Sequence, residues 1–446
     1  MIKYFGSCAW VTQPRLKTRK RKTEMNDLLI KLGELFSPIA DFAKDGNWKM
    51  LIMWAIGGVL IYLAIKKQME PTLLLPIGFG AILMNFPGVV KVVCLGETSH
   101  VLSTSFLFPE EYAGKLCSEC GALLTTEYSG IAEPLHELYN AGIANELFPL
   151  LLFIGIGAMI DFGPLLNNPK LMIFGAAAQF GIFFTLCMAS VFFPEIKDAA
   201  SISIIGAADG PTSIVVANKL GSNYVGAITV AAYSYMALVP IIQPPVIKAL
   251  TTKNERRIRM SYTQRSVSKT TKILFPIIIS VIACIFAPGA GSLIGFLMFG
   301  NLIRECGVLD SLSETAQKVL ANLITIFLGI TIAFNMSAGQ FLNGDTLLIM
   351  GLGLIAFIVD TAGGVLFAKL YNLVMKLLKK PLINPMIGAA GISAFPMSGR
   401  IVHKMALEED NQNFLLMHSI GVNVSGQIAS VLAGGMILNL LPQMIK

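Results

Sequence analysis

Residues 205–213 read IGAADGPTS, an apolar run that an aspartate, two glycines and a proline interrupt. The surrounding segment, residues 202–217, is otherwise as apolar as a membrane-spanning helix, but Pro211 removes a backbone donor that a helix needs. A second apolar segment, residues 382–398, is broken in the same way by two glycines and two prolines. Backbone groups freed at membrane depth must be satisfied by protein or by a water-lined cavity. Both segments are therefore predicted to contribute to a functional site.

The rest of the chain has the composition of a membrane protein. Hydrophobic types make up 54% of the 446 residues and charged types only 14%, against roughly 25% in soluble domains. This excludes a disordered chain, a secreted disulfide scaffold and an ordinary cytosolic enzyme. The net charge of +7 is attributed to cytoplasmic loops and not to a nucleic-acid partner. We expect a multi-pass protein of the cell (inner or plasma) membrane, embedded in the lipid bilayer.

About ten membrane passes are predicted from apolar runs of roughly 20 residues. The run Ile273–Ile303 is counted as two passes, because Pro288-Gly289 lies at its middle. The predicted fold class is an all-α polytopic membrane protein with two broken or re-entrant segments. The runs are Lys49–Ile65, Pro71–Val90, Leu147–Ile160, Leu171–Phe193, Tyr224–Leu250, Ile273–Ile303, Val319–Phe334, Thr346–Leu370 and Phe414–Leu441.

The two broken segments indicate an internal repeat. The word IGAA at residues 205–208 recurs at residues 387–390, and the preceding apolar helices and polar turns follow in the same order in both halves. The sequence leaves open whether the halves are inverted. The predicted divisions are 1–46, a basic N-terminal extension and lead-in; 47–146, two membrane helices and an acidic loop; 147–250, the first repeat; 251–272, a basic cytoplasmic linker; 273–317, linking membrane helices; and 318–446, the second repeat.

Two features lie outside the repeats: the basic N-terminal residues and a pair of cysteines. Residues 1–22 are basic and no apolar stretch follows directly, so a signal peptide is not predicted and Met25 is hypothesised to be the true start. Cys117 and Cys120 form a single C-x-x-C pair. Zinc would need two further ligands, so these thiols are interpreted as part of a loop.

Asp209 is the strongest candidate for a functional side chain. An ionised carboxylate is costly in hydrocarbon, so intramembrane acids usually face a cavity and serve function. Thr212 and Ser213 add hydroxyl oxygens, and the glycines let backbone carbonyls approach an ion. Such an oxygen set suits a proton or a hard cation such as Na⁺. The alternative is an aspartate that caps a helix.

The second half of the chain offers neutral oxygens and one cation. Asn423, Gln427 and Ser430 share one face of a helix, and interhelical hydrogen bonding is the alternative to a site role. Arg400 directly follows the second broken segment. It presents a fork suited to a carboxylate, but a snorkelling anchor remains equally open. Tyr233 and Tyr235 are both interpreted as residues that pack between helices.

Four motifs resemble the β subunit of sodium-ion-translocating biotin-dependent decarboxylases, the oxaloacetate, methylmalonyl-CoA and glutaconyl-CoA decarboxylase family. The resemblance runs from about residue 25 to the C-terminus, in the order of the family. The motifs are LFPLLLFIGIGAM (147–159), GAADGPTS (206–213), NPMIGAAGIS (384–393) and NVSGQ (423–427).

The resemblance implies a function that composition and spacing do not show. The subunit decarboxylates N-carboxybiotin, which a partner carries, and couples this to Na⁺ export with a proton consumed. The implied partners are a biotin carrier subunit, a carboxyltransferase α subunit and a small membrane subunit of the γ/δ type. The implied fold is an inverted-repeat, elevator-like bundle that forms homo-oligomers. Biotin is not attached to this chain, and the acyl substrate is left open.

The resemblance also implies roles for single residues. Asp209 corresponds to the acid linked to both sodium and the proton, and Arg400 to the arginine that engages carboxybiotin. Tyr235 is assigned with these two to the catalytic set, and Ser393 with Arg400 to carboxybiotin. The implied sodium ligands are Asp209, Asn384, Gly388, Ser393, Asn423 and Ser430.

Two other functions remain open from the residues alone. A sodium-coupled carboxylate transporter or a sodium/proton antiporter would share the repeats, the broken segments and Asp209. A non-catalytic scaffold fits less well, because it gains nothing from interrupted backbone at membrane depth. The sequence has no G-x-x-x-x-G-K-[ST] motif for hydrolysis of ATP through a P-loop.

Overall fold

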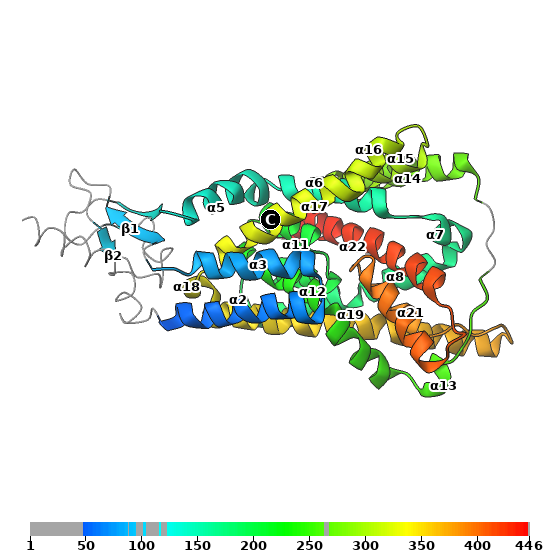
Figure 1. Cartoon of the computed structure of the whole chain (residues 1–446). Helices are drawn as coiled ribbons and strands as arrows, with labels where there is room; N and C mark the ends of the chain where they lie inside the picture. The colour runs from blue at the N-terminus through cyan, green and yellow to red at the C-terminus, as the bar shows by residue number, and fades with distance from the viewer. Residues whose placement is uncertain are drawn as a thin grey trace, which may run out of the picture.

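The computed structural model describes residues 48–87, 89–94, 101–103, 116, 123–262 and 267–444 (Figure 1). Within these ranges the chain is predominantly helical, as predicted for an all-α polytopic membrane protein. The hypotheses about Met25 and about Cys117 and Cys120 concern positions outside the described residues.

The first two helices form an antiparallel pair (Figure 1). Helix α2 (Trp48–Lys67) and helix α3 (Pro71–Met84) are joined by a tight turn in which Glu70 has a positive φ of 36°. The backbones cross closely at Gly57 and Gly78: a Cβ at Gly57 would lie 2.6 Å from the carbonyl oxygen of Gly78. Glycine at these two positions therefore permits the close contact between the helices.

A small sheet follows the α2–α3 pair. Strand β1 (Val90–Cys94) lies between β2 (Val101–Ser103) and β3 (Leu124–Tyr128), and both pairings are antiparallel. The sequence predicts only an acidic loop in this region. Figure 1 shows the sheet at the end of the molecule opposite α13 (Lys253–Arg256) of the basic linker.

The remaining elements form two halves of the chain, and each half contains one of the two broken segments. The first half contains α5 (Ala132–Tyr139), η1 (Asn140–Ala144), α6 (Leu147–Met159), α7 (Gly163–Asn167), η2 (Pro169–Leu171), α8 (Met172–Ala178), α9 (Phe180–Phe192), α10 (Ile196–Ser203), η3 (Ile204–Ala207), α11 (Gly210–Leu220) and α12 (Val225–Leu250). The second contains α14 (Lys269–Phe286), η4 (Pro288–Ala290), α15 (Gly291–Glu305), α16 (Asp310–Glu314), η5 (Thr315–Leu320), α17 (Ala321–Ile332), η6 (Ala333–Met336), α18 (Ala338–Phe341), α19 (Gly344–Leu377), α20 (Met386–Ala389), α21 (Met397–Glu409) and α22 (Leu416–Met444).

Six helices among the described residues are long and apolar enough to cross a membrane. A seventh span would result if the pair 132–144 and 147–159, bent by 62°, acts as one. The predicted count of about ten passes also included shorter and interrupted segments, and it stays a prediction. The six helices are Trp48–Lys67, Pro169–Phe192, Val225–Leu250, Asp310–Met336, Gly344–Leu377 and Leu416–Leu441.

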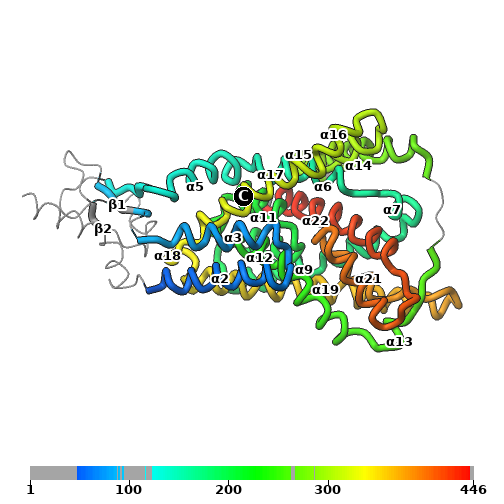
Figure 2. The backbone as a smooth tube through the Cα atoms, viewed as in Figure 1, coloured from blue at the N-terminus to red at the C-terminus, as the bar shows by residue number. Residues whose placement is uncertain are grey.

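Buried apolar side chains form two large clusters. One gathers around α2, α3, α6 and α17, and the other around α8, α15, α20 and α22. Figure 2 shows the backbone of α11 near the centre of the molecule, and its adjacent residues Ile214 and Val215 belong to one cluster each. Helix α11, whose N-cap residue is Asp209, therefore packs on both clusters.

Candidate functional site

The two broken segments meet in space. The backbone N–H of Ser393 donates a hydrogen bond to the carbonyl oxygen of Ala207 (3.0 Å), and Ala208 has a positive φ of 53°. The amide of Asn423 in α22 donates to the carbonyl oxygen of Ile392 (2.7 Å). Two backbone carbonyl groups at the breaks are thus satisfied by hydrogen bonds from other elements, and one of these bonds comes from the other half of the protein.

Asp209 is buried at this junction and accepts four hydrogen bonds, three of them from other side chains. Its exposed fraction is 3%. Oδ2 accepts from Thr212 Oγ1 (2.7 Å), Gln427 Nε2 (2.9 Å) and Ser430 Oγ (3.0 Å), and Oδ1 accepts from the backbone N–H of Thr212 (3.3 Å). The last bond caps α11, so the capping interpretation holds alongside the polar cluster.

Ser393 and Asn423 lie beside the side chains that contact Asp209. The hydroxyl groups of Ser393 and Ser430 lie 2.9 Å apart. Asn423 lies on the same helix, α22, as Gln427 and Ser430, and its Oδ1 is buried with no hydrogen-bond partner. Gln427 and Ser430 on the predicted polar face of this helix thus contact Asp209, and Asn423 on the same face carries an unsatisfied carbonyl oxygen.

A cavity of about 250 Å³ adjoins Asp209. Its lining extends from Asp209, Ser393 and Gln427 to Glu70 in the turn between α2 and α3. Arg400, an exposed residue in the first turn of α21, acts electrostatically on Glu70. Burial raises the pKa of the Glu70 carboxyl, and the positive charge of Arg400 partly offsets this effect. The cavity therefore connects the buried acid with the region of an exposed arginine.

The two tyrosines take different places. The ring of Tyr233 lines the cavity and packs on Gly210, where a Cβ would lie 2.6 Å from the ring. Tyr235, which the resemblance favoured, instead donates its hydroxyl to the carbonyl oxygen of Met350 in α19. Residues two apart point to different faces of a helix, so only Tyr233 can face Asp209 from α12.

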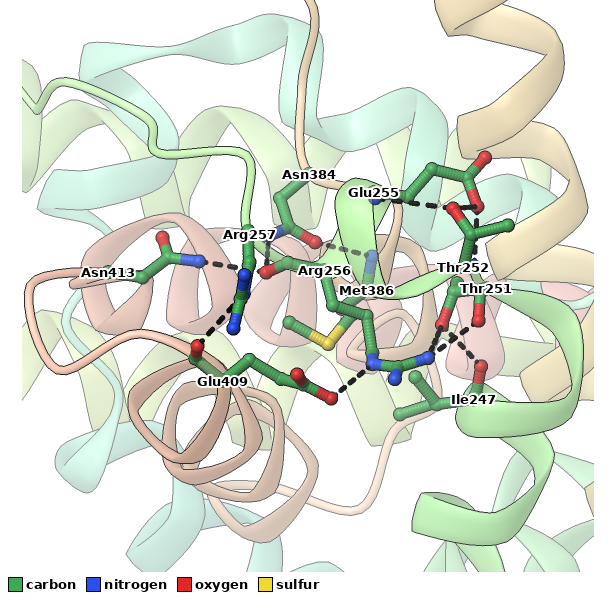
Figure 3. Close-up of polar contacts among 10 residues, drawn as sticks. All are labelled: Ile247, Thr251, Thr252, Glu255, Arg256, Arg257, Asn384, Met386, Glu409 and Asn413. Carbon is green, nitrogen blue, oxygen red and sulfur yellow. Dashed lines mark hydrogen bonds and ion pairs between the residues drawn. The ribbon is translucent and has the colours of Figure 1, made fainter.

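Asn384 lies away from Asp209, in a polar cluster that we call the linker clasp: Arg256, Asn384, Glu409 and Asn413 (Figure 3). The carbonyl oxygen of Arg256 accepts from the amides of Asn384 (2.8 Å) and Asn413 (2.9 Å). The Arg256 guanidinium donates to Glu409 (2.7 Å) and to the carbonyl oxygen of Thr251 (2.6 Å). The clasp holds the basic linker to the start of the second broken segment and to the end of α21.

Replacement of Glu409 by glutamine should weaken the clasp. The hydrogen bond from Arg256 lowers the pKa of the Glu409 carboxyl, so its stabilisation is present at neutral pH and is lost as the pH falls below the ordinary value of 4.5. We expect Glu409→Gln to lower the free energy of unfolding by about 1 kcal/mol at pH 7. The variant should also lose less stability than wild type as the pH falls. Thermal unfolding of the complex between neutral and acid pH measures this. Glu408→Gln, on the exposed neighbouring residue, is the control, and equal profiles for the two variants would count against the clasp.

Gly388 lies at a crossing with α19 and not beside Asp209. A Cβ at Gly388 would lie 2.0 Å from the carbonyl oxygen of Gly364, and one at Gly364 would lie 2.2 Å from the carbonyl oxygen of Gly388. Close approach of two backbones accounts for glycine at this position.

Replacement of Gly388 by alanine should therefore destabilise the protein. Backbone atoms cannot rotate away as a flexible side chain can, so we expect a loss of about 3 kcal/mol or a failure to assemble. Gly351→Ala in α19 is the control, because a Cβ there meets nothing within 4 Å. Yield and thermal unfolding of both variants check this, and equal stability would contradict it.

Sequence reasoning missed two acids. Asp360 in α19 is fully buried, although it was visible as a lone acid in the predicted span Thr346–Leu370. Glu70 lines the cavity but looked like an ordinary residue between two helices. A systematic survey of acids within apolar runs would have found the first of these.

Comparison with known proteins identifies the family. Residues 49–441 match the family model described as Na⁺-transporting oxaloacetate decarboxylase beta subunit. The chain is 48% identical over 400 residues to the methylmalonyl-CoA decarboxylase subunit beta of Propionigenium modestum, covering 88% of this chain and 95% of that protein. It is 45% identical over 411 residues to the oxaloacetate decarboxylase beta chain of Klebsiella pneumoniae, covering 87% and 94%.

These matches agree with the buried acid, the two broken segments and the membrane-spanning helices, and they favour a decarboxylase subunit over a secondary transporter. The chain belongs to the family of β subunits of sodium-transporting decarboxylases.

Proposed function

We propose that this chain decarboxylates carboxybiotin presented by a partner subunit and uses the reaction to export Na⁺, with one proton-accepting site at Asp209. The observation that carries the proposal is the geometry of Asp209: a buried carboxylate among hydroxyl and amide groups, beside a cavity whose lining extends to Glu70 near Arg400. In the described part of the chain, no ion pair involves Asp209. A transported cation can therefore serve as its counter-charge.

Sodium is the transported substrate, and its ligands are proposed to be Asp209, Ser393, Asn423 and Ser430. Carboxylate, hydroxyl and amide oxygens are the ligands that hard cations prefer. The unsatisfied Oδ1 of Asn423 supports the assignment, because a buried carbonyl oxygen without a partner is costly unless a ligand completes it. Asn384 and Gly388 are proposed to act indirectly, through the linker clasp and the α19 crossing.

The same carboxyl group is proposed to alternate between Na⁺ and a proton. Sodium stabilises the ionised form by direct attraction, whereas burial without the ion favours the neutral form. In the neutral form Asp209 can donate one hydrogen bond and continue to accept others. Exchange of one cation for the other at Asp209 would link sodium transport to the proton that the reaction consumes.

Arg400 is proposed to hold the carboxylate of carboxybiotin. Loss of CO₂ leaves a biotin nitrogen that takes up a proton. A guanidinium group can bind a carboxylate with two parallel hydrogen bonds, and the exposed position of Arg400 lets a partner present its substrate. Tyr233 is better placed than Tyr235 to contact a group in the cavity, and Ser393 links that cavity to the sodium ligands.

The wider architecture is proposed to follow that of the family. The two broken segments, which meet at Ser393 and Ala207, support an inverted-repeat bundle of about ten passes that works by an elevator-like movement. The proposed partners are a biotin carrier subunit, a carboxyltransferase α subunit and a small γ/δ-type membrane subunit, and the chain itself is proposed to form homo-oligomers. The exposed basic linker and Arg400 give the carrier a place to approach.

Dependence on biotin separates this function from secondary transport. The complex is purified from native membranes, reconstituted in vesicles and treated with avidin in the presence of Na⁺. We expect avidin to stop both decarboxylation and sodium uptake. Sodium uptake that a carboxylate gradient drives equally well with avidin present would support a secondary transporter instead.

A further inference from the structure

Asp360 is a second buried acid, and it lies outside the cavity beside Asp209. Its exposed fraction is 0%, and it does not line that cavity. Oδ1 accepts a short hydrogen bond from the backbone N–H of Gly181 (2.5 Å), and the backbone of Ile182 also bonds to the carboxyl group. Asp360 therefore caps the first turn of α9 from the neighbouring helix α19.

The other carboxyl oxygen has no partner. Oδ2 is buried and accepts no hydrogen bond, and no ion pair in the described ranges involves this residue. It faces η3: a Cβ added at Gly206 would lie 2.8 Å from Oδ2 and 2.9 Å from the Cβ of Ala356. Gly206 is three residues before Asp209, so Asp360, which joins α9 to α19, also lies against the turn that leads into the proposed sodium site.

The surroundings of Asp360 provide no countercharge. Helices α8 and α9 and the turn η3 contain no Asp, Glu, His, Lys or Arg. The other elements that pack on α19 near this point carry ionisable groups elsewhere: Lys197 and Asp198 in α10, and Tyr233, Tyr235 and Lys248 in α12, whereas α20 carries none. The buried hydroxyl groups of Thr185 in α9 and Thr361 in α19 also lack partners.

A bound proton fits this site better than a metal ion does. A hard cation needs several oxygen ligands around it. The close approach of Gly206 and Ala356 leaves less than a methyl group of space beside Oδ2. A proton needs no such volume, and it removes the cost of an ionised, unpaired carboxylate at membrane depth.

We propose that Asp360 is a second proton-binding carboxyl, which carries its proton on Oδ2 in this conformation and, as a neutral group, positions η3 and Asp209. The proposal goes beyond the proposed function, because it concerns a group outside the sodium cavity. Asp360 is a positioning residue: it acts on the ion site through α9 and η3.

The test compares a neutral isostere with a truncation in the purified native complex. Asparagine keeps an acceptor for the α9 backbone and no charge, so Asp360→Asn should keep sodium half-saturation and turnover within about threefold of wild type. Alanine leaves two buried N–H groups without an acceptor, so Asp360→Ala should raise the sodium half-saturation at least about tenfold or prevent assembly. Asp345→Asn, at the exposed start of the same helix, is the matched control. The proposal would be overturned if Asp360→Asn impaired sodium half-saturation as much as Asp360→Ala does. It would also be overturned if neither variant changed sodium half-saturation or assembly.

Infrared spectroscopy gives a readout that does not depend on activity. A protonated carboxyl has a carbonyl band separate from those of carboxylates. At saturating Na⁺, which keeps Asp209 ionised, we expect a band that is present in wild type and Asp345→Asn and lost in Asp360→Asn. An unchanged band in Asp360→Asn would overturn the proposal. If that variant does not assemble, ¹³C-aspartate labelling of an Asp209→Asn complex decides the question: a labelled protonated band supports the proposal, and its absence overturns it.

Discussion

Replacement of Asp209 by asparagine should lower sodium-stimulated decarboxylation by about two to four orders of magnitude, while the complex still assembles. Asparagine keeps the volume of the side chain and can still accept from Thr212, but it removes the charge that a sodium ion would neutralise. Loss of one partner of a buried charge interaction costs about 3–5 kcal/mol, and each 1.36 kcal/mol is a factor of ten in rate. The measurement is turnover against Na⁺ concentration.

The matched control for this variant is Asp198→Asn. Asp198 is also 3% exposed and accepts hydrogen bonds from the hydroxyl of Ser222 and from the backbone and amide of Asn223, away from the proposed ion site. We expect this variant to keep the sodium dependence of wild type even where it lowers stability. Similar sodium curves for the two asparagine variants would contradict the role of Asp209.

Replacement of Arg400 by alanine should weaken use of the carboxylated carrier without weakening sodium binding. A hydrogen-bonded pair with a charged group contributes about 1.5–3 kcal/mol, which corresponds to a rise in KM for the carboxylated carrier of about ten- to a hundredfold. Lysine keeps the charge but cannot form the two parallel bonds, so Arg400→Lys should fall between alanine and wild type.

Two measurements separate an effect on the carboxylated carrier from an effect on sodium binding. Steady-state kinetics with the carboxylated carrier gives KM, and protection of the complex by Na⁺ against thermal unfolding reports the ion site. Lys404→Ala is the control, because Lys404 is exposed one turn further along α21 and carries the same charge. Equal KM values for Arg400→Ala and Lys404→Ala would show that Arg400 is only a surface anchor.

The sequence predicted much of the site because its chemistry is local. Asp209 stood out through the glycines and the proline beside it, and the spacing of Asn423, Gln427 and Ser430 predicted a single polar face. The structure places Gln427 and Ser430 on Asp209, with Asn423 binding the second broken segment. Hydrogen bonds within one turn and periodicity along one helix are properties that a sequence can reveal.

Other features depend on contacts between distant segments. The resemblance grouped Asn384 and Gly388 with the ion ligands. In the structure, Asn384 instead contacts Arg256, 128 residues away in the sequence, and Gly388 contacts Gly364. Tyr233 and Tyr235 differ by two residues, and only the way α12 packs on its neighbours decides which faces the cavity. The small sheet is built from short strands without a clear alternation, so periodicity could not predict it.

The most direct test measures CO₂ release and ²²Na⁺ uptake in the same inside-out vesicles, with wild type and Asp209→Asn compared side by side. The account predicts that wild type takes up Na⁺ in a fixed ratio to the CO₂ released, and that Asp209→Asn loses both activities together. Asp209→Asn complexes that still decarboxylate carboxybiotin and accumulate Na⁺ at the wild-type ratio would contradict it.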